Sequence, residues 1–288
     1  MRVAVVTTSY PETDADPSGH FVRAEVDALR REGHEVTVAA ARGDAFGWPG
    51  VVARLRERPW VALGAARELL HLRRLVARAR PDRIIAHWAV PSGLVARGLG
   101  PIELVSHGAD VRLLCQLPHA VRARAVRALC NDAVAWRFVS GSLLRELVTA
   151  LPLADARAVE RIALVRPSPI ELPSRASLPA VDRLRPKSPL AVSIGRLIAT
   201  KRVDRVIDHV ATLPGTELVI VGDGPERANL ERHAALLGVD ARFLGLRPRV
   251  EALAWIAAAD LVVHASEAEG LSTVLREAEA FGTAVCVV

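Results

Sequence analysis

The length, composition and charge of this chain exclude several classes of protein. Its 288 residues are 51% apolar, which is enough material for two domains of ordinary size and argues against a disordered chain or a coiled coil. The net charge is +6, and residues 51–100 alone carry ten arginines and three acidic residues, so the basic surface belongs to the first half. The three cysteines lie far apart without metal-ligand spacing, and their odd number fits a reducing compartment.

The N-terminal stretch MRVAVVTTSYP is a strand-like apolar run that ends at Pro11. It is too short and wrongly flanked for a signal peptide. No stretch approaches the ~18 consecutive apolar residues that a membrane span requires. We therefore expect a cytoplasmic protein, with peripheral contact at the inner face of the membrane as a secondary expectation.

Short runs rich in valine and isoleucine alternate with helical patterns along the chain. The runs predict strands at residues 2–8, 34–40, 83–88, 103–106, 191–195, 217–222, 241–245, 260–265 and 284–288. Between them, FVRAEVDALRREG and VDRVIDHVATL have the apolar period of amphipathic helices. This alternation predicts an α/β fold of parallel, doubly wound sheets.

The pattern breaks once, in the stretch LPSRASLPAVDRLRPKSPL, which contains four prolines. Such a stretch is typical of a linker between domains. We predict a first domain at residues 1–172, a linker at 173–189 and a shorter second domain at 190–288.

Cations cluster before the first helix of the second domain. Arg196 follows the strand PLAVSIG, and Lys201 and Arg202 directly precede the helix that begins at Val203. Cations at a helix start oppose the macrodipole, at ~0.3 to 1 kcal/mol each when exposed. A bound anion would reverse the sign of that penalty, whereas the alternative interpretation is a set of solvated surface cations.

The closing segment EAEGLSTVLREAEAF predicts the matching half of an anion site. With Ser272 as N-cap and Thr273 in the first turn, a helix start here presents free backbone N–H groups to a phosphate. Glu277 lies about five residues further on, roughly 7.5 Å along the axis, and a carboxylate there can accept bonds from two ribose hydroxyls. If the anion is a diphosphate, Glu269 would bind hydroxyls of the group on its far side. The alternative makes Glu269 a loop acid and Glu277 a solvated helical acid.

Several motifs in order resemble a known family. SIGRLIATKRVDRVID, IVGDGPERANLE, ARFLGL and SEAEGLSTVLREAEAFGTAV are similar to the nucleotide-sugar half of glycosyltransferase family 4, retaining enzymes of the GT-B architecture. The resemblance includes the E-x7-E signature, here Glu269 to Glu277, and the spaced basic pair Arg196 and Lys201. It implies two Rossmann-like domains facing a cleft.

The resemblance also implies roles for single residues. Arg196 and Lys201 would bind the donor diphosphate, Glu277 the ribose, Glu269 the transferred sugar, and the amides of residues 270–274 the phosphates. The implied donor-binding set is Gly19, Arg196, Lys201, Gly222, Gly224, Gly270, Leu271, Ser272, Thr273 and Glu277.

The GDGP turn at residues 222–225 follows a strand, where we expect its glycines to permit tight backbone geometry. It resembles a loose GxGxxG motif, but Arg227 stands where the third glycine would be. A nicotinamide site is therefore disfavoured.

The first domain carries weaker motifs of the same family. Gly19 marks the turn into the opening helix, and His107 matches the HG-x-D element, whose histidine faces the donor sugar in the family. His87 and Trp88 are equally compatible with lining the cleft and with packing in the core. The implied catalytic set is His107, Arg196, Lys201 and Glu269.

We therefore predict a retaining glycosyltransferase that moves a hexose from a nucleoside-diphosphate sugar to a glycan or lipid-linked acceptor in cell-envelope polysaccharide synthesis, without a metal or other cofactor. Family members continue beyond AVCVV, so we expect the chain to be truncated and its second domain incomplete. The alternative is an inactive relative that binds nucleotide sugar or a partner chain without turnover.

A third interpretation is a basic protein that binds nucleic acid or a membrane surface. The helix ARELLHLRRLVARAR has Leu69, Leu72, Leu75 and Val76 along one side, which suits an interfacial helix and equally a packed helix with a solvated basic face. No aromatic stacking pattern for nucleic acid is present, so no nucleic-acid partner is expected.

Overall fold

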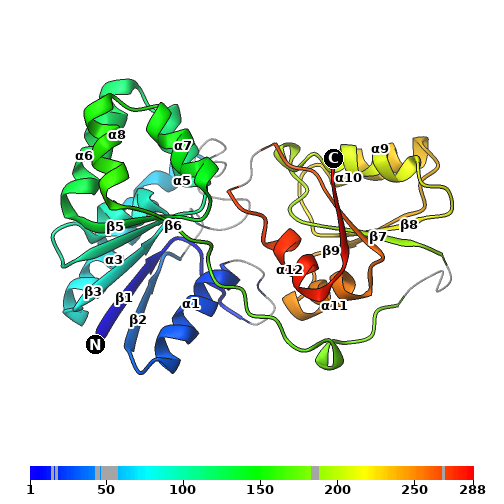
Figure 1. The fold of residues 1–288 in the computed structure, drawn as a ribbon, viewed down its shortest axis with the longest axis horizontal. Coiled ribbons are helices and arrows are strands. Elements are labelled where there is room, and N and C mark those ends of the chain that lie inside the picture. The colour runs from blue at the N-terminus through cyan, green and yellow to red at the C-terminus, as the bar shows by residue number, and fades with distance from the viewer. Residues whose placement is uncertain (14–15, 17–18, 43–45, 47–57, 183–187, 268–269) are drawn as a thin grey trace. The chain divides into compact units, whose positions relative to one another are not determined.

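The computed structural model describes residues 1–13, 16, 19–42, 46, 58–182, 188–267 and 270–288 (Figure 1). The chain separates into two compact units, one formed by residues 1–11 and 18–169 and the other by residues 12–17 and 170–288. Each unit carries one parallel sheet with helices alternating between its strands, which confirms the predicted α/β fold class.

The first unit contains a six-stranded sheet in the order β2-β1-β3-β4-β5-β6, with every pair parallel. Its strands are β1 (Arg2–Thr7), β2 (Glu35–Ala40), β3 (Arg83–His87), β4 (Ile102–Ser106), β5 (Ala133–Phe138) and β6 (Ala163–Val165). Its helices are α1 (His20–Arg31), α3 (Val61–Ala79), α4 (Leu94–Ala96), α5 (Ala109–Gln116), α6 (His119–Asp132), α7 (Gly141–Thr149) and α8 (Leu153–Ile162), with a π-helical turn η1 (Ala89–Gly93).

The second unit contains a five-stranded sheet in the order β11-β10-β7-β8-β9, again fully parallel. Its strands are β7 (Leu190–Ile194), β8 (Glu217–Val221), β9 (Ala241–Gly245), β10 (Leu261–His264) and β11 (Ala284–Val287). Its helices are α9 (Val203–Ala211), α10 (Arg227–Leu236), α11 (Arg249–Ala258) and α12 (Thr273–Phe281), with 3-10 turns η2 (Arg175–Ser177) and η3 (Ala199–Lys201).

Alternating strand residues of the second unit pack against different helices. Ala191, Leu218 and Ile220 contribute to a core with α9 and α10, whereas Val192 and Val219 contribute to a core with Trp255 of α11. Successive side chains of a strand point to opposite faces, so helices cover both faces of this sheet, as Figure 1 also shows. The sheet is therefore doubly wound, as predicted.

The apolar stripe predicted for α9 is confirmed. The stripe consists of the apolar residues at positions i, i+3, i+4 and i+7 of the helix, and all of them are buried: Val203, Val206, Ile207 and Val210. The stripe fixes the rotation of α9 about its axis and so determines where the preceding turn, η3, presents its side chains.

The structure distinguishes between the two interpretations of the apolar side of α3. Leu72 and Val76 are buried in the core of the first unit, and Leu69 and Leu75 are half-buried. A side of a helix that packs on its own sheet cannot lie on a membrane, so the alternative of a packed helix with a solvated basic face is the one observed.

Each sheet has a point where the strand order reverses. In the first unit the chain passes from β1 to β2 on one side and then to β3 on the other, and in the second unit from β7 through β8 and β9 and then to β10. Ligands of open parallel sheets bind outside the carboxyl ends of strands at such a point. The loops after β7 and β10, and those after β1 and β3, are therefore where sites are expected.

Candidate functional site

Three loops at the carboxyl ends of β7, β8 and β10 meet in the second unit. The amide of Leu197, after β7, donates to the carbonyl of Asp223, after β8, at 2.9 Å. The amide of Glu267, after β10, donates to the carbonyl of Thr200 at 3.1 Å, and the Ser266 hydroxyl donates to the same carbonyl at 3.3 Å. The structure thus joins the loop of Arg196 to the GDGP turn and to the loop that leads into α12.

The two glycines of the GDGP turn permit close backbone contacts at this junction, as predicted from their residue type. Gly222 has a φ of +140°, and a Cβ on it would lie 1.9 Å from the carbonyl oxygen of Gly195. Gly224 has a φ of +157°, and its Cβ would lie 2.3 Å from the carbonyl oxygen of Leu197. Only glycine allows the turn to press against the backbone on either side of Arg196.

The cations of the loop after β7 have different surroundings. Arg196 is exposed, and Lys201 is half-buried at the end of η3. Arg202 caps α9 in the left-handed region, with its guanidinium 2.8 Å from Asp204 and 2.5 Å from Glu267. The penalty for a cation at this helix start is therefore compensated by two carboxylates at Arg202, a compensation that the sequence pattern did not reveal.

The start of α12 has the predicted cap. Ser272 is the N-cap, and its hydroxyl accepts a long hydrogen bond of 3.5 Å from the amide of Leu275. Gly270, Leu271 and Thr273 are half-buried beside it. The amides of a first helical turn have no partner within the helix, so they are available to an anion. Glu269 lies outside the described residues.

Glu277 is buried, which excludes the alternative that it is a solvated acid on the helix surface. It is 3% exposed, and its Oε1 accepts a hydrogen bond of 2.7 Å from Arg249 at the start of α11. Burial raises the pKa of Glu277, while Arg249 and then Arg276 act in the opposite direction. Sequence reasoning missed Arg249, because it lies 28 positions from its partner and belongs to no recognised motif.

Arg227 has a structural role in place of the third glycine of a dinucleotide motif. Its guanidinium donates to Glu231 at 2.8 Å and to the carbonyl of Phe243 at 3.0 Å, and lies 3.4 Å from Asp223. It therefore ties the GDGP turn to β9.

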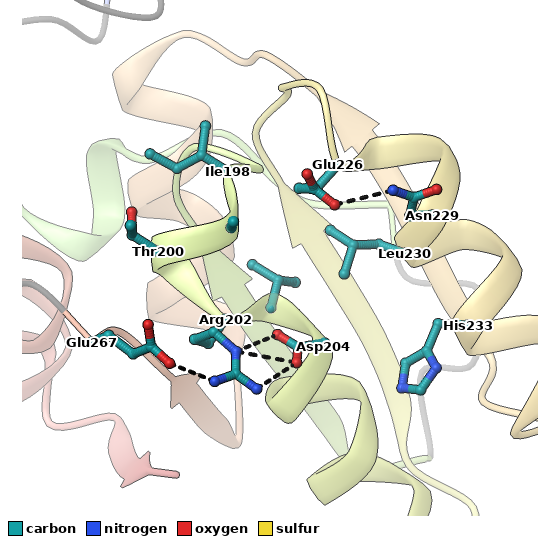
Figure 2. Close-up of a pocket in the computed structure, with 11 residues that line it drawn as sticks. Ile198, Thr200, Arg202, Asp204, Glu226, Asn229, Leu230, His233 and Glu267 are labelled. Atoms are coloured by element: carbon teal, nitrogen blue, oxygen red, sulfur yellow. Dashed lines mark hydrogen bonds and ion pairs between the residues drawn. The ribbon is translucent and has the colours of Figure 1, made fainter. Parts of the chain in front are cut away.

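A cavity of about 580 Å³ opens beside this junction (Figure 2). None of the residues predicted to bind the donor lines it, although Lys201 lies in the turn that forms one of its walls. Its lining comprises Ile198, Ala199, Thr200, Arg202, Val203, Asp204, Glu226, Asn229, Leu230, His233 and Glu267. The cavity therefore shares a wall with the predicted site without being that site.

The HG-x-D element of the first unit is organised by its aspartate. One carboxylate oxygen of Asp110 accepts from the amides of His107 and Gly108, both at 3.1 Å, and the other accepts from the amide of Ala89 at 2.9 Å. Burial raises the pKa of Asp110, and these hydrogen bonds together with one from Ser106 act in the opposite direction. The aspartate thereby joins the loop after β4 to the loop after β3.

His107 lies half-buried among aromatic rings. Its ring centroid is 4.6 Å from that of Phe21 and 4.8 Å from that of Trp88. His87 is fully buried, which confirms a core position for it, and its Nδ1 lies 3.0 Å from Nε2 of His107. Burial lowers the pKa of His87 to about 3 and that of His107 well below its usual value, and the Arg137 charge lowers both further.

Gly19 marks the start of α1, as predicted. Its φ is +63°, and a Cβ on it would lie 2.3 Å from the carbonyl oxygen of Ser9. The glycine therefore lets the loop after β1 press closely against the start of α1.

Within the described part of the chain, no group of three or more His, Cys, Asp or Glu side chains could hold a metal ion. No helix among the residues described is long and apolar enough to cross a membrane.

Residues 174–288 match the model of the family described as glycosyl transferases group 1. Over 110 residues the chain is 37% identical to the lipopolysaccharide core biosynthesis glycosyltransferase LpsE of Rhizobium meliloti, covering 37% of this chain and 32% of that protein. It is 29% identical over 213 residues to a protein of Bacillus subtilis named as the putative teichuronic acid biosynthesis glycosyltransferase TuaC, covering 69% of this chain and 50% of that one. The chain thus spans half or less of the length of these two relatives.

Solved structures share the fold. The structure of Anabaena Alr3699/HepE in complex with UDP and glucose superposes with a TM-score of 0.66 at 20% identity, covering 99% of this chain and 80% of that one. The crystal structure of WaaG, a glycosyltransferase of lipopolysaccharide biosynthesis, superposes with a TM-score of 0.58 at 18% identity, over 99% of this chain and 80% of that one. The chain therefore has an α/β fold of the GT-B type.

Proposed function

We propose that this chain transfers a hexose from a nucleoside-diphosphate sugar to a glycan or lipid-linked acceptor. The proposal is supported by the match of residues 174–288 to the glycosyl transferases group 1 family and by the fold of the GT-B type. The observation that carries the proposal is the junction of three loops, which sets Arg196, Lys201 and the start of α12 on the carboxyl edge of one sheet.

The chemistry of the donor explains why these groups matter. When the bond between the anomeric carbon and the diphosphate breaks, negative charge develops on the leaving phosphate. A guanidinium, an ammonium and helix-start amides stabilise that charge more in the transition state than in the ground state, which is how such groups accelerate a reaction. Arg196 and Lys201 are in this view the catalytic cations.

Other side chains would hold the rest of the donor. The carboxylate of Glu277, which accepts from Arg249, would also receive the ribose hydroxyls, since a carboxylate can accept several hydrogen bonds. Glu269 would bind the transferred sugar, and His107 would contact a hydroxyl of the sugar. These three roles rest on the motif resemblance.

We propose retention of the anomeric configuration and no metal. In a front-face transfer, the acceptor hydroxyl attacks the anomeric carbon on the side from which the diphosphate leaves. The new bond joins the acceptor oxygen to that carbon, and the proton of the hydroxyl passes to an oxygen of the departing phosphate. Glu269 and Glu277 are then not a glycosidase pair, because they hold different parts of one donor instead of flanking one bond.

The test measures the release of nucleoside diphosphate from UDP-glucose, GDP-mannose and ADP-glucose. With the donor that is used, Arg196→Ala should lower turnover about 100- to 1,000-fold, the usual effect of losing one preorganised donor at such a site. Arg205→Ala removes an exposed arginine of α9 and should leave the rate unchanged. An unchanged rate in Arg196→Ala contradicts the assignment, and tight donor binding without any turnover supports the alternative of a relative that only binds.

A second role is favoured by the surface of α3. Trp60, Leu63 and Leu70 are 72%, 63% and 56% exposed, and the exposed arginines 67, 74 and 78 lie on the same helix. Apolar side chains beside cations suit a helix that rests on an anionic membrane. We propose that this face, and not the buried one, brings the enzyme to lipid-linked acceptors.

A further inference from the structure

A line of polar side chains runs inward from His107 in the first unit. Nε2 of His107 lies 3.0 Å from Nδ1 of His87, and Nε2 of His87 lies 3.8 Å from Oε2 of Glu25. The other oxygen of Glu25 is ion-paired with Arg137 of β5. The last three side chains are buried and belong to three different elements, β3, α1 and β5.

The contact between the imidazoles is a hydrogen bond in the plane of the rings. The ring planes differ by 15°, and the ring centroids lie 5.2 Å apart, well beyond the 3.0 Å between the two nitrogens. Face-to-face stacking would not place the centroids so much further apart than the nitrogens. One nitrogen of this pair therefore donates a proton and the other accepts it.

The position of Glu25 decides which imidazole donates. A neutral imidazole has one N–H and one bare nitrogen. Nε2 of His87 and Oε2 of Glu25 are both buried, and neither has a hydrogen-bond partner among the described residues. With its proton on Nε2, His87 directs that proton at the carboxylate, whereas the opposite tautomer would set two lone pairs against each other in the core.

The tautomer of His87 also determines the tautomer of His107. If His87 is protonated on Nε2, its Nδ1 is the acceptor, so His107 must supply the proton from its own Nε2. The same surroundings keep each ring at one proton, because burial and the Arg137 charge disfavour a second.

We propose that Glu25 and His87 are positioning residues that hold His107 in the neutral tautomer protonated on Nε2, which leaves its Nδ1 as a hydrogen-bond acceptor. The use of that acceptor rests on the proposed function, in which the ligand beside His107 is a hydroxyl-rich sugar that donates hydrogen bonds. The tautomer itself does not depend on that function.

Nitrogen-15 NMR of the histidine rings in the full chain without ligand tests the tautomer at neutral pH, with His107→Gln used to assign the signal. The expected spectrum shows His107 and His87 both protonated on Nε2. Protonation of His107 on Nδ1 overturns the proposal. Because no sugar is present, this result is separate from the fate of the proposed function, which a lack of nucleotide-sugar binding would contradict on its own.

Two variants test the role of Glu25. Glu25→Gln keeps the shape, but its amide can donate as well as accept, so the His107 signal should shift toward a mixture of both tautomers. His71→Gln removes an exposed histidine of α3 and should leave the His107 signal unchanged. A fully Nε2-protonated His107 in folded Glu25→Gln would overturn the role of Glu25. If that variant does not fold, the wild-type spectrum still decides the tautomer.

Discussion

Arg249, the first residue of α11, donates a hydrogen bond of 2.7 Å to Glu277 in the middle of α12. The carboxylate is almost fully buried, whereas the arginine side chain keeps about a fifth of its surface exposed, at 21%. The arginine therefore serves as the counter-ion that lets a carboxylate stay charged under the proposed ribose site.

Removing this counter-ion should destabilise the protein. Breaking a buried ion pair by deleting one partner costs ~3 to 5 kcal/mol, and the partial exposure of Arg249 places Arg249→Met near the lower value. The free energy of unfolding, measured with urea, should fall by about 3 kcal/mol above neutral pH. A loss within the error of the measurement would contradict this account.

The same variant should be sensitive to pH. Burial raises the pKa of Glu277 in the folded state, and without Arg249 that pKa rises further. A carboxyl with a raised pKa destabilises the fold while it is charged, so the deficit of Arg249→Met should shrink as the pH falls through that pKa and the carboxyl takes up a proton. The double variant Arg249→Met with Glu277→Gln has no such charge, and its deficit should not depend on pH in this way.

Gly222 provides a test of how the loop of Arg196 is held. Gly222→Ala places a methyl group against the carbonyl of Gly195, while Gly100→Ala lies at a comparable φ of +153° and its Cβ would come no nearer than 3.5 Å to a neighbouring atom. The left-handed backbone alone costs ~1 to 2 kcal/mol, and the overlap at Gly222 should add ~1 to 3 kcal/mol. Chemical unfolding of both variants measures the difference, and equal losses would mean that the close approach does not matter.

The exposed face of α3 predicts how the protein binds vesicles. The wild type should bind vesicles of phosphatidylglycerol, and binding should weaken between about 0.1 M and about 1 M NaCl as the Debye length falls from about 10 Å to about 3 Å. The pair Trp60→Ser and Leu63→Ser should weaken binding at least about tenfold, since burying each side chain is worth ~1.5 to 3 kcal/mol.

Leu236→Ser provides the matched control, because Leu236 is an exposed apolar residue of the second unit. Its binding should equal that of the wild type. If no vesicle binding is detected at any salt concentration, the membrane role is wrong.

The sequence pattern predicted the central strands well, because strands buried on both faces are continuous apolar runs. It failed at β5, which contains Trp136, Arg137 and Phe138, and at β6, which has only three residues. Arg137 interrupts the apolar run, yet it is buried because Glu25 and Glu103 pair with it. Such compensation between distant positions cannot be read from local periodicity.

The sequence predicted those features of the candidate site that depend on residues close together in the chain. The glycines of the GDGP turn and the cap at Ser272 follow from residue type and spacing, and the structure confirms their geometry. The partners of Glu277 and His107 come from other elements, so only the fold reveals them.

The central claim is that a diphosphate binds between Arg196, Lys201 and the start of α12, and calorimetric titration with UDP, GDP and ADP tests it most directly. The account predicts that at least one of the three binds the wild type. It also predicts that the affinity falls about 100-fold or more in the double variant Arg196→Ala and Lys201→Ala, since each charged hydrogen bond contributes ~1.5 to 3 kcal/mol. Equal affinity for the wild type and the double variant would contradict the account.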